Sequence, residues 1–148
     1  MLTNEQTSQR FSEIAVYFET LTPDTTQAIA QFYSSDCTFK DPFNEVRGVE
    51  HTKRIFLHMF SALIRPRFVI TGRVIQANEA FLVWDFVFEM PRFVKGEQRV
   101  RGTSHLKLAG DGLISFHRDY WDAAEELYEK LPVLGALMRL LKRQNRVA

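Results

Sequence analysis

The chain has 148 residues, a length that suits one domain with a hydrophobic core of its own. Charged residues make up 25% and the net charge is +1, so the composition gives no reason to expect a nucleic acid partner. A single cysteine, Cys37, excludes an internal disulfide bond. The polar N-terminus and the lack of a long apolar run predict a cytoplasmic protein without stable membrane insertion.

Apolar residues at three- and four-residue spacing predict helices in the first part of the chain. The first helix has an apolar stripe made of Phe11, Ile14, Ala15, Phe18 and Leu21. Thr22 and Pro23 are typical of a helix start and predict a second helix, which would bury residues 28, 29 and 32. A short strand is predicted at 37–39, and a third helix is predicted over 49–63.

Beyond residue 67 the apolar period changes from 3.6 to 2, which predicts strands. They are expected over residues 68–76, 81–90, 99–108 and 113–121. Gly110-Asp111-Gly112 predicts a tight hairpin turn between the last two. The strand over 81–90 is apolar on both faces, so helices should cover one face and a second copy of the chain the other. This predicts a homodimer.

The tail reads as helical again, with Leu127 and Leu131 on one side and Pro132 as an interruption. A second apolar stripe follows, flanked by basic residues, at Val133, Leu134, Leu137, Met138 and Leu141. We expect it to pack on its own domain; a lid, a dimer interface and a membrane surface contact are the alternatives. The whole pattern predicts one α+β domain, a cone-shaped curved antiparallel sheet with three N-terminal helices around a pocket. Its core covers residues 8–121 and a C-terminal helical extension covers 122–148.

Two segments resemble a known family. The run from Phe32 to Phe43, FYSSDCTFKDPF, and the run from Gly102 to Ile114, GTSHLKLAGDGLI, are similar to signatures of nuclear transport factor 2-like proteins. The similarity is greatest to the ketosteroid isomerase and SnoaL-like polyketide cyclase branches. The resemblance extends over residues 8 to about 121 and implies a pocket for a small apolar molecule.

The resemblance also implies site residues. Asp41 stands where ketosteroid isomerase has its general base, and Tyr17 stands where it has an oxyanion tyrosine. Ser104 stands in place of the second oxyanion donor, an aspartic acid in that enzyme, which departs from a true steroid isomerase. On the last strand the pocket-facing positions are His117, Asp119 and Trp121, alternate residues on one strand face.

Each of these residues also has a purely structural interpretation. Asp41 would then only hold the Asp-Pro turn, Tyr17 would be a core residue, and Ser104 would only make room. His117 and Asp119 would then belong to a polar network at a strand end or dimer interface. For the cavity wall we predict four aromatic residues: Phe18, Trp84, Phe86 and Trp121.

Three functions are open at this point. The first is an isomerase, cyclase or dehydratase that transfers protons on an apolar carbonyl compound without a cofactor. The second is a ligand-binding module of the same fold without turnover, and the third is a protein-interaction domain. No metal-type spacing occurs, since His51 and His58 are seven residues apart on the third predicted helix, so no metal is predicted.

Overall fold

A computed structural model describes residues 1–92, 95–126 and 143. Its α-helices are α1 (Asn4–Glu19), α2 (Pro23–Thr26), α3 (Val49–Ala62) and α4 (Ala123–Glu126), with a 3₁₀ turn, η1, at Ile29–Gln31. No helix within these described residues is long and apolar enough to cross a membrane. The apolar stripes predicted over 127–131 and 133–141 lie outside the described residues.

Six strands form one curved sheet in the order β2-β1-β6-β5-β4-β3. They are β1 (Tyr33–Lys40), β2 (Glu45–Arg47), β3 (Ile64–Gln76), β4 (Glu79–Glu89), β5 (Glu97–Leu108) and β6 (Ile114–Tyr120). The α+β class and the four long strands are as predicted. All neighbouring strands are antiparallel except β1 and β6, which run parallel.

The structure differs from the sequence prediction mainly around β1. The predicted three-residue strand is eight residues long, because β1 pairs with β6 on one side and with the unpredicted β2 on the other. The second helix is shorter than predicted and breaks into η1 after α2. Tertiary pairing therefore overrides the local pattern in this segment.

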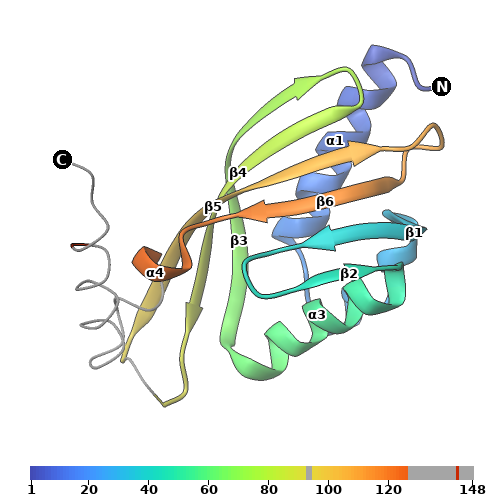
Figure 1. The fold of residues 1–148 in the computed structure, drawn as a ribbon. Coiled ribbons are helices and arrows are strands. Elements are labelled where there is room, and N and C mark those ends of the chain that lie inside the picture. Colours follow the sequence, from blue (N-terminus) through green and yellow to red (C-terminus); the bar gives the residue numbers. More distant parts are fainter. Residues whose placement is uncertain (93–94, 127–142, 144–148) are drawn as a thin grey trace.

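The core lies between the sheet and its helices. The sheet curls round α1, while α3 packs against β1, β2 and β3 (Figure 1). A capping box of Thr3 and Gln6 starts α1, whose buried stripe meets the inner face of the strands. Cys37 is fully buried in this core, as its apolar character predicts. The arrangement leaves an unclosed cone whose inner face is apolar.

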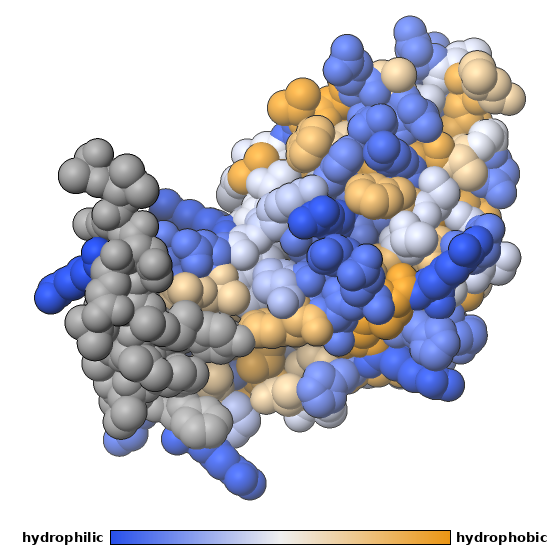
Figure 2. Space-filling view, in the orientation of Figure 1, coloured by the Kyte–Doolittle hydropathy of each residue, from blue (hydrophilic) through white to orange (hydrophobic). Residues whose placement is uncertain are grey.

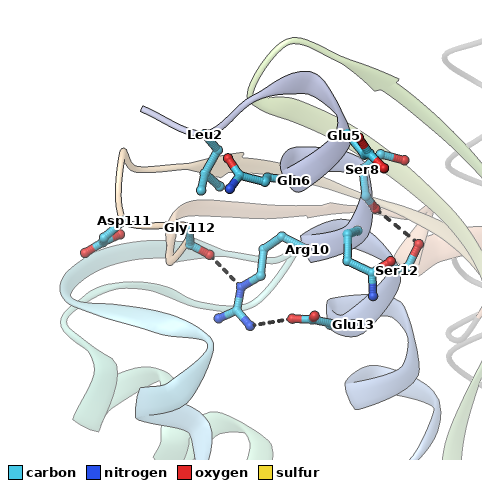
Figure 3. Close-up of a pocket in the computed structure, with 10 residues that line it drawn as sticks. Leu2, Glu5, Gln6, Ser8, Arg10, Ser12, Glu13, Asp111 and Gly112 are labelled. Carbon is cyan, nitrogen blue, oxygen red and sulfur yellow. Dashed lines mark hydrogen bonds and ion pairs between the residues drawn. The ribbon is translucent and has the colours of Figure 1, made fainter.

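Arg10 ties α1 to the β5–β6 turn at the far end of the cone (Figure 3). Its Nε donates to the carbonyl oxygen of Gly112 at 2.8 Å, and its Nη2 donates to the carbonyl oxygen of Gln31 at 2.5 Å. Nη1 lies 3.0 Å from a carboxylate oxygen of Glu13. The guanidinium is therefore engaged on all three nitrogens in holding this end of the fold together.

The outer face of the sheet carries exposed apolar side chains, which alternate with the buried ones along each strand. Figure 2 shows apolar patches between polar side chains on the visible face of the molecule. The large exposed apolar residues on β3, β4 and β6 are Ile64, Val69, Val74, Phe81, Val83 and Tyr120. Such a surface is typical of an interface.

We expect the protein to form a homodimer through this outer face, because pairing two copies removes the exposed apolar side chains from water. Sedimentation at micromolar concentration should give twice the mass of one chain. Phe81→Glu would place two charges in a symmetric interface and should shift the equilibrium to monomer. A wild-type protein that sediments as a monomer contradicts this prediction.

Candidate functional site

A cavity of about 270 Å³ opens between α3, the end of β1 and the long strands. Its walls are mostly aromatic and aliphatic. The polar residues on them are Asp41, Asn44, His58 and Asp119. Small-molecule sites have this character, mostly apolar with a few polar groups, although this volume lies just below their usual range of roughly 300–1,000 Å³.

A second, narrow void of about 10 Å³ adjoins the inner end of this cavity. The two share four lining residues, namely Phe56, Phe68, Trp84 and Asp119. Phe18, Ser104 and His117 line the inner void. Asp119 is therefore the one carboxylate that lines both spaces.

A chain of hydrogen bonds passes through the inner end of the site. The Tyr33 hydroxyl lies 2.6 Å from Nδ1 of His117, whose Nε2 lies 2.7 Å from Oδ1 of Asp119. The Ser104 hydroxyl donates to the same Oδ1 at 2.5 Å. Trp84 Nε1 donates to the Ser104 oxygen at 2.9 Å. His117 and Asp119 share one strand face, as predicted.

One assignment of donors and acceptors satisfies the hydrogen bonds between Tyr33, His117 and Asp119. Burial raises the pKa of Tyr33 well above its ordinary value, so its hydroxyl keeps its hydrogen. Within the described part of the chain that hydroxyl has only Nδ1 of His117 as an acceptor, so Nε2 carries the imidazole hydrogen and donates to Asp119. Tyr33 thus orients the His117 ring, and the ring in turn holds the Asp119 carboxylate.

Asp119 is held by one oxygen and keeps the other available. Oδ1 accepts both hydrogen bonds, and among the described residues no donor reaches Oδ2. Buried side-chain oxygens in the described part of the chain all have partners, so Oδ2 is not sealed in the core. A carboxylate held in this way can accept a proton from a molecule in the cavity.

Sheet register brings these side chains together. Ser104 pairs directly with Asp119 across β5 and β6, and Phe39 of β1 pairs with His117. Ser104 gives its only hydrogen to Asp119, so it positions the carboxylate and has none left for a substrate oxygen. The sequence analysis missed Tyr33. Its position inside the FYSSDC run was visible, but its contact with His117 depends on the parallel β1–β6 pair.

Asp41 lines the cavity, but its carboxylate also organises its own loop. Oδ1 accepts from the backbone N–H groups of Phe43 and Asn44 at 2.8 and 2.6 Å, and the Asn44 amide reaches both oxygens at 3.2 Å. This is the turn-holding contact that Asp before Pro favours. Asp41 is therefore less free than Asp119 to receive a proton.

Tyr17 does not reach the cavity, which corrects the expectation that it would join Asp41 and His117 there. Its ring stacks on Phe32 with centroids 3.9 Å apart, and its hydroxyl donates to the carbonyl oxygen of Thr25 at 2.9 Å. That carbonyl ends the short helix α2, where such groups lack partners within the helix. Burial raises the pKa of Tyr17 to about 12.

The remaining predicted residues lie where the cavity wall was expected. Trp84, Phe86 and Trp121 line the main cavity, and Phe18 lines the inner void. Trp84 is buried and donates into the hydrogen-bond chain, so it belongs to the wall and to the polar network at once.

Comparison with known proteins places this chain in a family. The family model described as a SnoaL-like domain matches residues 14–117, which is well over half of the chain. This chain belongs to the SnoaL-like domain family. No curated protein sequence matches it.

Solved structures share the fold of this SnoaL-like domain at low sequence identity. A ketosteroid isomerase-like protein from Catenulispora acidiphila in complex with trimethylamine is 14% identical, with a TM-score of 0.70, and the alignment covers 83% of this chain and 93% of that one. A putative SnoaL-like polyketide cyclase from Shewanella putrefaciens is 16% identical (TM-score 0.69, coverage 82% and 95%). An LEH-like epoxide hydrolase from M. tuberculosis is 14% identical (TM-score 0.68, coverage 92% and 97%).

A larger hollow of about 570 Å³ lies at the N-terminal end of this SnoaL-like domain (Figure 3). It is lined by α1 and the β5–β6 turn, and Arg10 crosses it with its guanidinium engaged. The hollow is open, and the Asp119 carboxylate does not line it. The smaller aromatic cavity is therefore the candidate site.

Gly102 of the SnoaL-like domain makes room for Trp84. A Cβ atom at position 102 would lie 2.3 Å from Cη2 of the indole, so Gly102→Ala must displace the ring. We expect a loss of about 1–3 kcal/mol in the free energy of unfolding, measured by urea denaturation. Gly110→Ala is the matched control, because a Cβ there meets nothing within 4 Å. Equal stability of the two variants would contradict this placement of the indole.

Proposed function

We propose that this protein transfers a proton on a small, largely apolar carbonyl compound, with Asp119 as the base and without a cofactor. The observation that supports this most is the carboxylate of Asp119, anchored through Oδ1 with Oδ2 available at the inner end of an aromatic cavity. Solved structures that share the fold include a putative SnoaL-like polyketide cyclase and an LEH-like epoxide hydrolase, so the fold accommodates chemistry on small molecules.

The proposed step needs few groups. A carbon–hydrogen bond next to the substrate carbonyl breaks, Oδ2 of Asp119 takes the proton, and the electron pair moves to the carbonyl oxygen as an enolate. The protonated carboxyl group then returns the proton to carbon. Ser104 and His117 act as positioning residues, because their hydrogen bonds hold the carboxylate and neither takes part in the proton transfer itself.

The experiment is proton exchange in deuterated buffer. Small cyclic and aromatic ketones and enones that fit the cavity are incubated with the protein, and deuterium incorporation next to the carbonyl is followed by NMR. We expect enzyme-dependent incorporation with at least one of them. Binding is read independently from tryptophan fluorescence, because both tryptophans of the chain, Trp84 and Trp121, line the cavity.

The same experiment separates catalysis from simple binding. If compounds of the panel quench the fluorescence and none exchanges, the protein is a ligand-binding module of the same fold and the proton-transfer proposal is wrong. If exchange occurs and is blocked by a non-exchanging ligand that quenches the fluorescence, the reaction takes place in this cavity.

A further inference from the structure

Aromatic rings dominate the wall of the cavity. Eight of them line it, and they are Phe39, Phe43, Phe56, Phe68, Trp84, Phe86, Phe88 and Trp121. Several meet edge to face, including Phe43 with Trp121 at 5.5 Å between centroids and Phe68 with Trp84 at 5.3 Å. The face of an aromatic ring is negative, so walls of this kind attract cations as well as apolar groups.

Two carboxylates on the same wall have no lysine or arginine partner among the described residues. Asp41 and Asp119 both line the cavity, and within the described residues neither forms an ion pair with a lysine or arginine. Their hydrogen bonds come from backbone, amide, hydroxyl and imidazole groups. Within the described residues, a cation in the cavity would therefore meet two carboxylates that no lysine or arginine already occupies.

Carboxylates on the strands outside the cavity are arranged differently. Asp85 is paired with Arg99 at 2.7 Å and with Arg101 at 3.8 Å. Glu79 meets His105 and Lys107, and the hydrogen bond to His105 is the main cause of a lowered pKa of Glu79. Asp85 and Glu79 thus have basic side chains beside them, whereas within the described residues Asp41 and Asp119 have no lysine or arginine beside them.

Aromatic rings and a carboxylate lie together at the mouth of the cavity. Phe43 is about half exposed and therefore stands at the opening, with its ring against Trp121. Its backbone N–H donates to Asp41, which brings that carboxylate to the same part of the wall. Asp119 and the buried Trp84 also line the inner void, whereas Asp41 lines the main cavity alone.

We propose that the ligand of this cavity is an organic cation, an apolar molecule carrying an ammonium group that binds at the mouth among Phe43, Trp121 and Asp41. This rests on the proposed function and narrows its substrate class from apolar carbonyl compounds to those with an amine. The ammonium group sits at the mouth, and the carbon that loses its proton lies at the inner end beside Asp119.

The test compares ligands of the same shape and different charge. Benzyltrimethylammonium has a neutral carbon isostere, neopentylbenzene, and phenylacetate serves as the anionic compound. Binding to the full chain is followed by tryptophan fluorescence. We expect the ammonium compound to bind roughly tenfold more tightly than its neutral isostere, and phenylacetate to bind more weakly than both. Equal or tighter binding of the neutral isostere, or no binding of the ammonium compound, overturns the proposal.

Variants locate the cation. Asp41→Asn and Phe43→Leu should each reduce the preference for the ammonium compound over its isostere by about threefold or more. Asp36→Asn is the matched control for loss of one carboxylate, because Asp36 is exposed on β1 and does not line the cavity; its preference should equal that of wild type. Unchanged preference in both cavity variants contradicts placement at the mouth. Benzyltrimethylammonium has no carbonyl group, so this result is independent of the exchange assay that tests the proposed function.

Discussion

Asp119→Asn is expected to lower the rate of proton exchange by about 10²–10⁴-fold, the usual contribution of a positioned base. The asparagine keeps the size of the side chain, and its oxygen can still accept from Ser104 and His117. What disappears is the proton acceptor that Oδ2 supplies to the cavity. The loss should therefore appear in kcat, with ligand affinity for neutral compounds almost unchanged. Exchange rates and tryptophan fluorescence titrations measure the two effects separately.

Asp41→Asn is the matched control for this prediction. Both aspartates line the same cavity, but the oxygens of Asp41 accept hydrogen bonds from its own turn. Its substitution should therefore leave most of the exchange rate of the neutral ketones and enones intact. A rate loss in Asp41→Asn with normal exchange in Asp119→Asn would reassign the base to Asp41, the residue that the family resemblance implies.

Trp84→Ala is expected to lower the free energy of unfolding by about 3–5 kcal/mol, because it empties a buried site that the surrounding backbone cannot fill. The indole is 3% exposed, meets Phe68 edge to face and lies directly over Gly102. Its removal also takes the donor away from Ser104, which then holds Asp119 less firmly. Such a loss is a large part of the roughly 5–15 kcal/mol that stabilises a typical domain. Chemical denaturation measures it.

Phe43→Ala tests whether the Trp84 effect comes from burial. Both residues are aromatic and line the same cavity, but Phe43 is 54% exposed. We expect its loss to cost less than about 1 kcal/mol, as for most surface substitutions. A cost below about 1 kcal/mol for Trp84→Ala as well would contradict its place in the core.

Much of the fold could be predicted from the sequence, because it follows from local periodicity. The stripe of α1 and α3 and the alternation along β3 to β6 depend only on which residues recur at 3.6 or 2 positions. The shared face of His117 and Asp119 also follows from periodicity, because side chains two residues apart on a strand point to the same side of the sheet. The place of Trp121 on the cavity wall was what the family resemblance implied.

The contacts between side chains of the candidate site depend on the tertiary structure. Ser104 meets Asp119 only because of the register of β5 against β6, and Tyr33 meets His117 only because β1 joins β6 in parallel. Tyr17 lies away from the cavity, because its ring stacks on Phe32 and its hydroxyl donates to the carbonyl oxygen of Thr25. Periodicity tells which face a residue occupies, whereas a hydrogen bond between strands depends on their order and register. The family resemblance therefore implied Asp41 as the base, whereas our proposal of Asp119 depends on contacts that only the tertiary structure shows.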